Sequence, residues 1–195
     1  MGGTESGIVG LLLAAGSSQR FGRDKLEYPM PDGRPMAVAA AAGLLAVCER
    51  TIAVVRPADE RLATLLAETG CEIVRARHAE LGMGASLAAG VGASAEAEAW
   101  IVALADMPYI DRRSHQAVLS RLRAGASLAA TQYQGRRGHP VGFSKQWFSQ
   151  LTLLTGEQGG KTILESHPEQ LVLCPVEDRG VLLDIDTPAD LEKCD

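Results

Sequence analysis

Several features that mark other classes of protein are missing from this chain of 195 residues. No apolar run reaches the roughly 20 residues that a transmembrane helix needs. No Pro-, Gly- or Ser-rich linker divides the chain, so we expect a single domain over residues 1–195. Basic residues number 19 against 24 acidic ones, and the resulting formal charge of −5 gives no general attraction to nucleic acid or an anionic membrane. A small-molecule ligand is therefore expected.

Paired cysteine spacing is missing as well. The four cysteines, Cys48, Cys71, Cys174 and Cys194, are widely scattered and show neither the spacing of a zinc site nor that of a redox dithiol. The opening segment, Met1 to Gly7, is short and polar and does not resemble a secretory signal. We expect reduced thiols and a cytoplasmic location.

Short apolar runs alternate with helical patterns along the first two thirds of the chain. A hydrophobic content of 46% is enough for a sizeable core. The alternation predicts an α/β fold, a Rossmann-like three-layer α/β/α arrangement with a mostly parallel sheet. The predicted strands are Ile8–Ala14, Thr51–Val55, Glu72–Val74, Trp100–Ala105 and Ser127–Thr131, and the predicted helices are Met36–Val47, Ala58–Glu68 and Arg112–Arg123.

The pattern after Gln132 is less regular. Gly135 to Gly138 resembles a hairpin tip, and His139-Pro140 would begin the strand that follows it. Such an excursion can form the wall of a second substrate site. The remaining predicted elements are the helix Thr162–Ser166, the strands Leu171–Val176 and Val181–Ile185, and a last helix from Pro188.

A glycine-bearing loop with several cations follows the first predicted strand. Gly16 ends the strand, and Arg20, Gly22, Arg23 and Lys25 come after it. Open α/β sheets bind ligands at the carboxyl ends of their strands, so these residues are placed to hold an anion, most simply a phosphate chain. Neither the Gly-Lys-Ser/Thr end of a P-loop nor the G-x-G-x-x-G of a dinucleotide site occurs here. The alternative is a solvated polar turn.

Asp106 ends the most apolar predicted strand and would lie on the same edge of the sheet as Lys25. A carboxylate there would repel an anionic substrate unless a divalent cation lay between them, and Mg²⁺ is the natural ion. The alternative is that Asp106 caps the next helix or pairs with an arginine. Asp184 and Asp186 precede the last helix and, as members of a strand, would point to one side, where metal binding competes with capping.

Two further glycine clusters precede predicted helices. Gly82 and Gly84 come just before a helix with Ser86 in its first turn. Gly156 to Lys161 opens the helix that follows it. Both clusters would turn backbone N–H groups towards a ligand, whereas a solvated surface turn is the alternative for the second.

The order of these motifs resembles the MobA-like nucleotidyltransferases, and within them the molybdenum cofactor cytidylyltransferases. The resemblance spans nearly the whole chain, and its first motif is quite specific for nucleotidyltransferases of sugar phosphates and pterins. The motifs are LAAGSSQRFGRDK (Leu13–Lys25), LGMGASL (Leu81–Leu87), ADMP (Ala105–Pro108), GRRGHPVGF (Gly135–Phe143), GEQGGK (Gly156–Lys161) and DIDTPADL (Asp184–Leu191).

The resemblance implies a nucleotide-diphospho-sugar-transferase-like fold and transfer of a nucleotidyl group to a phosphate acceptor, with Mg²⁺ and release of pyrophosphate. Arg20, Lys25 and Asp106 would be the catalytic residues, and Asp106 and Asp186 would bind the metal, with Asp184 an alternative to Asp186. The implied nucleotide-binding residues are Leu13, Ala14, Ala15, Gly16, Arg20, Lys25, Gly82, Ser86 and Asp106. The implied acceptor-binding residues are His139, Pro140, Gly159, Gly160 and Lys161.

The same resemblance implies CTP and a molybdopterin-type cofactor, with a molybdenum enzyme as recipient. Ala14 and Ala15 resemble the cytidylyl branch, because the guanylyl branch more often has a second glycine there. Glu157 departs from the family, which often has Asp at this point of the last glycine loop. The alternatives are GTP with the same acceptor, CTP with a methylerythritol phosphate, and a nucleotide-binding chaperone that hands over the cofactor without turnover.

Overall fold

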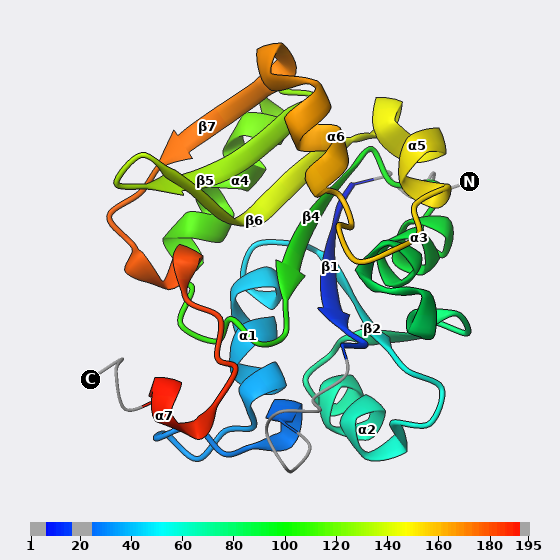
Figure 1. Ribbon diagram of the computed structural model, residues 1–195, viewed down its shortest axis with the longest axis vertical. Helices are drawn as coiled ribbons and strands as arrows, with labels where there is room; N and C mark the ends of the chain where they lie inside the picture. The colour runs from blue at the N-terminus through cyan, green and yellow to red at the C-terminus, as the bar shows by residue number, and fades with distance from the viewer. Residues whose placement is uncertain (1–6, 17–24, 192–195) are drawn as a thin grey trace.

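The computed structural model describes residues 7–16 and 25–191. Seven strands form one sheet (Figure 1). The strands are β1 (Ile8–Ala14), β2 (Arg50–Val55), β3 (Glu72–Arg75), β4 (Ala99–Leu104), β5 (Leu128–Tyr133), β6 (Arg136–Ser144) and β7 (Leu171–Pro175). The α-helices of the described residues are α1 (Met36–Leu45), α2 (Glu60–Glu68), α3 (Met83–Gly92), α4 (Arg112–Arg123), α5 (Phe148–Thr152), α6 (Lys161–Ser166) and α7 (Pro188–Leu191).

The strand order is β3-β2-β1-β4-β6-β5-β7, and only β6 runs against the others. β1 lies between β2 and β4, and its register pairs Leu13 with Val54 on one side and with Leu104 on the other. The carboxyl ends of three neighbouring parallel strands therefore meet at one edge of the sheet, where α/β proteins bind their ligands.

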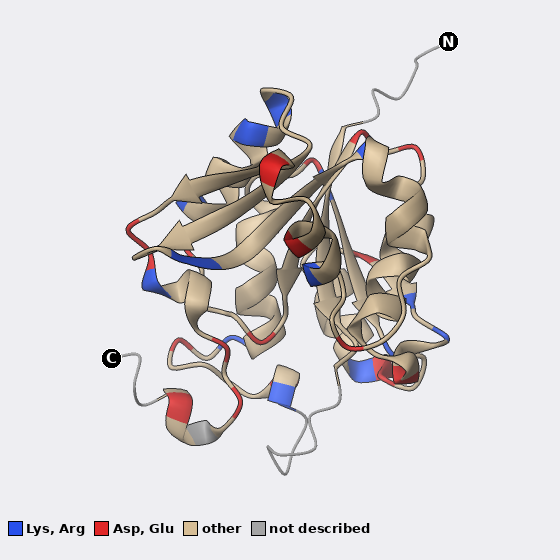
Figure 2. Cartoon of the chain, turned by 45° about the horizontal axis from the view of Figure 1, so that its top comes forward, with Lys and Arg blue, Asp and Glu red and all other residues tan. Residues whose placement is uncertain are grey.

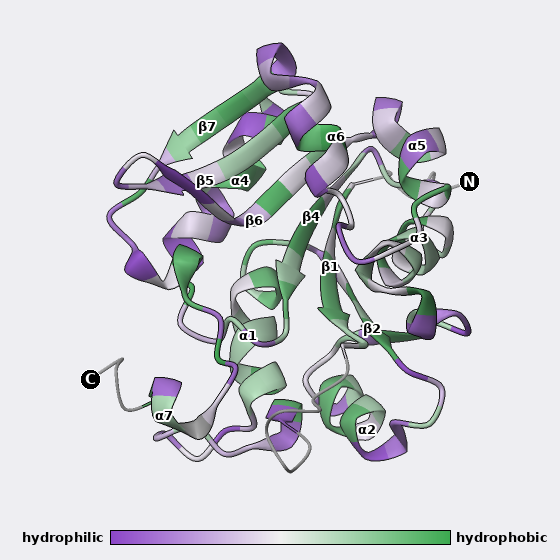
Figure 3. Ribbon diagram, viewed as in Figure 1, coloured by the Kyte–Doolittle hydropathy of each residue, from purple (hydrophilic) through white to green (hydrophobic). Residues whose placement is uncertain are grey.

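Two hydrophobic cores lie on opposite faces of the sheet because alternate side chains of a strand point to opposite sides. Leu12 and Ala14 of β1 pack with α1, α2 and α4, whereas Leu11 and Leu13 pack with α3, α5 and α6. Trp100 and Phe143 fill the second core and are fully buried. Figure 3 shows the resulting apolar colouring of β1 and β4. The predicted three-layer α/β arrangement with a mostly parallel sheet is confirmed.

Most predicted elements agree with the structure to within two residues, but the strand predicted over Val181–Ile185 is wrong. A 3₁₀ helix (Arg179–Leu182) covers its first two residues, and residues 183–185 belong to no helix or strand. Its turn is held by Asp178, whose carboxylate accepts hydrogen bonds from the backbone N–H groups of Gly180 and Asp111 at 2.8 Å each. A short apolar run is compatible with a strand and with a 3₁₀ turn. Here the hydrogen bonds to the carboxylate of Asp178 favour the turn.

The predicted hairpin between the fifth and sixth strands exists, but its tip lies earlier than predicted. Gln134 and Gly135 form the two-residue turn, with φ angles of 47° and 77°. Two residues with positive φ are what a type I′ hairpin turn requires. Consequently β6 begins at Arg136 rather than at His139.

Charged side chains are absent from β1, β4 and β5 and concentrate where strands end and on the loops and short helices (Figure 2). None of the helices in residues 7–16 and 25–191 has the length and apolar character needed to span a bilayer.

Candidate active site

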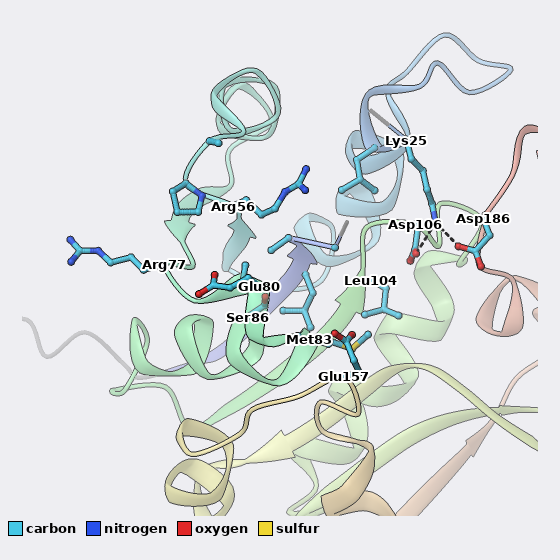
Figure 4. Close-up of a pocket in the computed structure, with 18 residues that line it drawn as sticks. Lys25, Arg56, Arg77, Glu80, Met83, Ser86, Leu104, Asp106, Glu157 and Asp186 are labelled. Carbon is cyan, nitrogen blue, oxygen red and sulfur yellow. Dashed lines mark hydrogen bonds and ion pairs between the residues drawn. The ribbon is translucent and has the colours of Figure 1, made fainter. Parts of the chain in front are cut away.

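Three charged side chains from distant parts of the chain meet at the carboxyl edge of the sheet. The Nζ atom of Lys25 donates hydrogen bonds to Oδ2 of Asp106 at 3.1 Å and to Oδ1 of Asp186 at 2.9 Å. Figure 4 shows the ammonium group pointing between the two carboxylates. The lysine side chain is only 9% exposed, whereas the side chains of Asp106 and Asp186 are 30% and 51% exposed.

Local structure explains how these three residues come together. Asp106 follows β4, and Lys25 opens a short 3₁₀ helix (Lys25–Glu27). The segment before α7 docks on the loop after β4 through a hydrogen bond of 2.9 Å from the backbone N–H of Ile185 to the carbonyl of Asp106. The buried side chain of Ile185 anchors this contact. Asp186, the next residue, is thereby carried to Lys25.

The electrostatics keep Lys25 charged. Burial opposes its ionisation, but the hydrogen bond to Asp186 and the charge and hydrogen bond of Asp106 outweigh that cost, so the pKa of Lys25 is raised above its usual 10.5. One ammonium between two carboxylates leaves this cluster with a formal charge of −1. It is therefore suited to receive a further cation.

A pocket of about 700 Å³ opens beside these residues, large enough for a nucleotide-sized ligand. Lys25, Asp106 and Asp186 lie at one end of it (Figure 4). Arg56, Arg77, Glu80 and Ser86 lie towards the other end. An elongated ligand would thus meet a charged cluster at one end and mixed polar groups at the other.

A second, smaller cavity of about 170 Å³ adjoins the pocket. The two share Leu13, Met83 and Leu104 in their walls. Its remaining lining is mostly apolar, with four polar side chains. The polar side chains are those of Arg137, His139, Gln158 and Lys161.

Two segments that contribute residues to both the pocket and the cavity, residues 82–83 and 157–160, are joined by backbone contacts next to them. The N–H of Gly84 donates to the carbonyl of Gly156 at 2.8 Å, and the N–H of Gly156 donates to the carbonyl of Leu81 at 2.7 Å. A Cβ at Gly84 would lie 2.7 Å from the carbonyl oxygen of Thr155, and one at Gly82, where φ is 101°, would lie 2.5 Å from backbone of Gly156. Gly82 and Gly84 are therefore required for this close approach of the two backbones.

The structure brings most of the predicted nucleotide-site residues to the pocket. Those that line it are Leu13, Ala15, Gly16, Lys25, Gly82, Ser86, Asp106 and Asp186. Ala14 does not, because its side chain faces the opposite side of the sheet and packs in the core with α1. Asp184 is exposed and does not line the pocket, whereas Asp186 does. Arg20 lies outside the described residues.

The predicted acceptor residues divide in the same way. His139, Gly160 and Lys161 line the smaller cavity. Pro140 is buried in β6 and Gly159 packs against Met83, so neither lines the cavity. Glu157, which departs from the family pattern, lines the larger pocket.

Sequence reasoning missed the polar residues that follow β2 and β3. Arg56 comes directly after β2, where its Nε donates to Asp59 at 2.8 Å, and Arg77 and Glu80 come shortly after β3. All three line the pocket. Their position at the carboxyl ends of parallel strands was the available signal, the same one that identified Asp106.

The donor set fits a divalent cation that is bound jointly with phosphates. In the described part of the chain no group of three or more His, Cys, Asp or Glu side chains could hold a metal by itself. Asp106 and Asp186 nevertheless already share one cation, the ammonium of Lys25. Mg²⁺ usually binds through one or two carboxylates and completes its shell with water and substrate phosphates.

Comparison with known proteins decides the family. The model of the MobA-like NTP transferase domain matches residues 10–171. The chain belongs to this family. "Purine catabolism protein PucB" of Bacillus subtilis (strain 168) is 27% identical over 197 residues, which cover 95% of this chain and 94% of the relative.

Solved structures agree. The Rv0371c homologue from Mycobacterium sp. strain JC1 has a TM-score of 0.80 and 29% identity, over 96% of this chain and 94% of that one. Rv0371c of Mycobacterium tuberculosis H37Rv in complex with manganese has a TM-score of 0.76 and 22% identity, over 95% and 96% of the two chains. The MobA-like protein described here is thus a nucleotidyltransferase, and a structural neighbour of it holds a divalent metal.

Proposed function

We propose that this MobA-like protein transfers CMP from CTP to the phosphate of a molybdopterin-type molybdenum cofactor and releases pyrophosphate, with Mg²⁺ as the metal. The observation that carries the proposal is the buried ammonium of Lys25 between Asp106 and Asp186. It lies at the charged end of a pocket that is large enough for a nucleotide. No nucleophilic side chain is needed, because the acceptor phosphate is itself the nucleophile.

Lys25 and Arg20 would hold the triphosphate. Charge builds up on the departing pyrophosphate during transfer, so a contact with Lys25 strengthens as the reaction proceeds and lowers the barrier. Asp106 and Asp186 would hold Mg²⁺, which supplies charge neutralisation across the phosphates. Lys25 must then leave the carboxylates it pairs with, and the triphosphate offers its ammonium a new partner.

The far end of the pocket would hold the base and ribose. Leu13, Ala15 and Gly16 present the end of β1 to the nucleoside, and Ser86 supplies a buried hydroxyl beside them. The choice of CTP over GTP rests on the resemblance of Ala14 and Ala15 to the cytidylyl branch. The acceptor would occupy the smaller cavity, with His139, Gly160 and Lys161 in its wall.

The biological setting is part of the proposal. The Bacillus subtilis relative is named for purine catabolism, which suggests a molybdenum enzyme of that pathway as recipient of the finished cofactor. We propose a cytoplasmic location, to which the free, buried thiols of Cys48, Cys71 and Cys174 are suited because disulfides are rare there. We also propose that residues 1–195 act as one domain, since one sheet connects the two pockets.

A pyrophosphate-release assay tests the proposal. Each of the four nucleoside triphosphates is supplied with Mg²⁺ and, in separate reactions, with molybdopterin-type cofactor or methylerythritol phosphate. Release is expected with CTP and the cofactor, and it should be lost in Asp106→Asn. Preference for GTP would assign the protein to guanylyl transfer. Tight nucleotide binding without any release would favour a cofactor chaperone.

A further inference from the structure

The smaller cavity is too small for a whole acceptor. Its volume of about 170 Å³ is well below the roughly 300 Å³ at which ordinary ligand pockets begin. It therefore accommodates one end of a ligand. Its floor is apolar, formed by side chains such as Val102, Val141 and Leu164, while its polar side chains include two cations, Arg137 and Lys161.

These two cations share one carboxylate. Nη2 of Arg137 donates to Oε1 of Glu165 at 3.4 Å, and Nζ of Lys161 lies 3.7 Å from the same oxygen. Charge-assisted hydrogen bonds are usually 2.7–2.9 Å long, so both contacts are loose. Glu165 itself does not line the cavity. Glu165 pairs with the two cations from outside the cavity. Arg137, Lys161 and Glu165 together carry a formal charge of +1, whereas Arg137 and Lys161 alone carry +2.

His139 contributes its ring to the wall of the smaller cavity. Burial lowers its pKa, against the opposing influence of the Val102 backbone and the Asp106 charge, so the ring is neutral at pH 7. Its Nδ1 is buried without a hydrogen-bond partner. The charges of Asp106 and Arg137 act on the pKa of this ring in opposite directions, since Asp106 raises it and Arg137 lowers it.

We propose that Arg137 and Lys161 form a clamp for the phosphate of the acceptor, and that Glu165 competes with this phosphate for the two cations. The inference rests on the proposed function and extends it to Arg137 and Glu165. A phosphate dianion matches the charge of +2 that the clamp presents once Glu165 is displaced, and the planar fork of an arginine suits two phosphate oxygens at once. The apolar part of the lining suits a phosphate monoester whose carbon atoms next to the phosphate are weakly polar.

Phenyl phosphate is a suitable probe, because it combines a flat apolar ring with a phosphate dianion. Its affinity for the full chain is measured by calorimetric titration, first alone and then with Mg²⁺ and the best-bound nucleoside triphosphate filling the larger pocket. Arg137→Ala and Lys161→Ala should each weaken binding about tenfold, the loss typical of one charge-assisted hydrogen bond. Arg136→Ala is the matched control: Arg136 is exposed, adjacent in β6 and outside the cavity, and its removal should change the affinity less than twofold.

Glu165→Gln separates competition from a structural role. Loss of a structural brace would weaken binding, whereas loss of a competitor should tighten it about threefold, and this gain should vanish when Arg137→Ala is added. Equal affinity of the parent and Arg137→Ala, no binding by the parent, or weaker binding by Glu165→Gln would each overturn the clamp. Thermal melts show whether the variants are folded. Failure of every nucleotide to bind would refute the proposed function, while the titrations without nucleotide still decide the clamp.

Discussion

Replacing Lys25 by methionine keeps most of the length of its buried stem and removes the ammonium group with its charge and hydrogen bonds. The structure allows the cost to be estimated. The hydrogen bond to Asp106, in a largely buried setting, is worth about 2 kcal/mol. The bond to Asp186, whose side chain is 51% exposed, is worth about 0.5–1 kcal/mol after solvent screening. The variant also avoids the cost of burying an ammonium group, which offsets part of the lost hydrogen-bond energy. Lys25→Met should therefore lower the free energy of unfolding by about 2 kcal/mol in the presence of a chelator.

The same variant should bind a divalent metal more tightly, because no ammonium has to be displaced from the carboxylates. A gain of about tenfold in Mn²⁺ affinity, or roughly 1.4 kcal/mol, is expected for the nucleotide-free protein. Turnover should fall nonetheless, since the contact with the departing pyrophosphate is lost.

Urea denaturation with and without Mn²⁺, together with titration of Mn²⁺ by electron paramagnetic resonance, measures both effects. Lys145→Met is the control, because Lys145 is exposed and such residues usually change stability by less than about 0.5 kcal/mol. A variant as stable as the parent in chelator, with the same Mn²⁺ affinity, would show that Lys25 does not occupy the cation position.

Three further outcomes are expected. Asp106→Asn should lower turnover about a hundredfold or more while the chain still folds, because a neutral amide is a poor ligand for Mg²⁺, and steady-state kinetics at saturating Mg²⁺ test this. Gly84→Ala should lower the free energy of unfolding by about 1–3 kcal/mol, since its Cβ would press on the backbone of Thr155, whereas Gly92→Ala, with open space around it, should be neutral or slightly stabilising in the same denaturation experiment. Burial lowers the pKa of His115 below 6.5, so its imidazole binds a proton more readily in the unfolded chain than in the folded one. The free energy of unfolding should therefore fall as the pH drops below about 6.5. Urea titrations between pH 7 and 5.5 should show a smaller fall for His115→Gln than for the parent.

The sheet edge could be predicted from the sequence because it depends on local patterns. Apolar runs identify strands and their carboxyl ends. Asp106 was singled out because it follows such a run, and Lys25 because it belongs to the glycine-bearing loop with cations after the first strand. The position of Asp186 beside Lys25 needed the tertiary structure. It depends on the hydrogen bond between Ile185 and Asp106, which no pattern within the segment encodes.

The acceptor side was predicted less well for a different reason. The sequence motif suggested a hairpin tip over Gly135–Gly138 and so assigned Arg137 to a turn. Because the turn is formed by Gln134 and Gly135, Arg137 is instead a strand residue that lines the cavity. Because the turn lies two residues earlier than predicted, residues 136–138 belong to β6 instead of to the turn. The position of the turn depends on backbone angles that the residue types permit but do not dictate.

The contact between Lys25 and Asp186 joins residues 161 positions apart. Asp186 follows all seven strands in the chain, so the charged cluster is complete only when the segment after β7 docks on the sheet. Without that docking, Lys25 would face Asp106 alone, in a cluster of no net charge that has less to offer a divalent cation. The proposed metal site thus depends on a docking contact, the hydrogen bond from Ile185 to the carbonyl of Asp106.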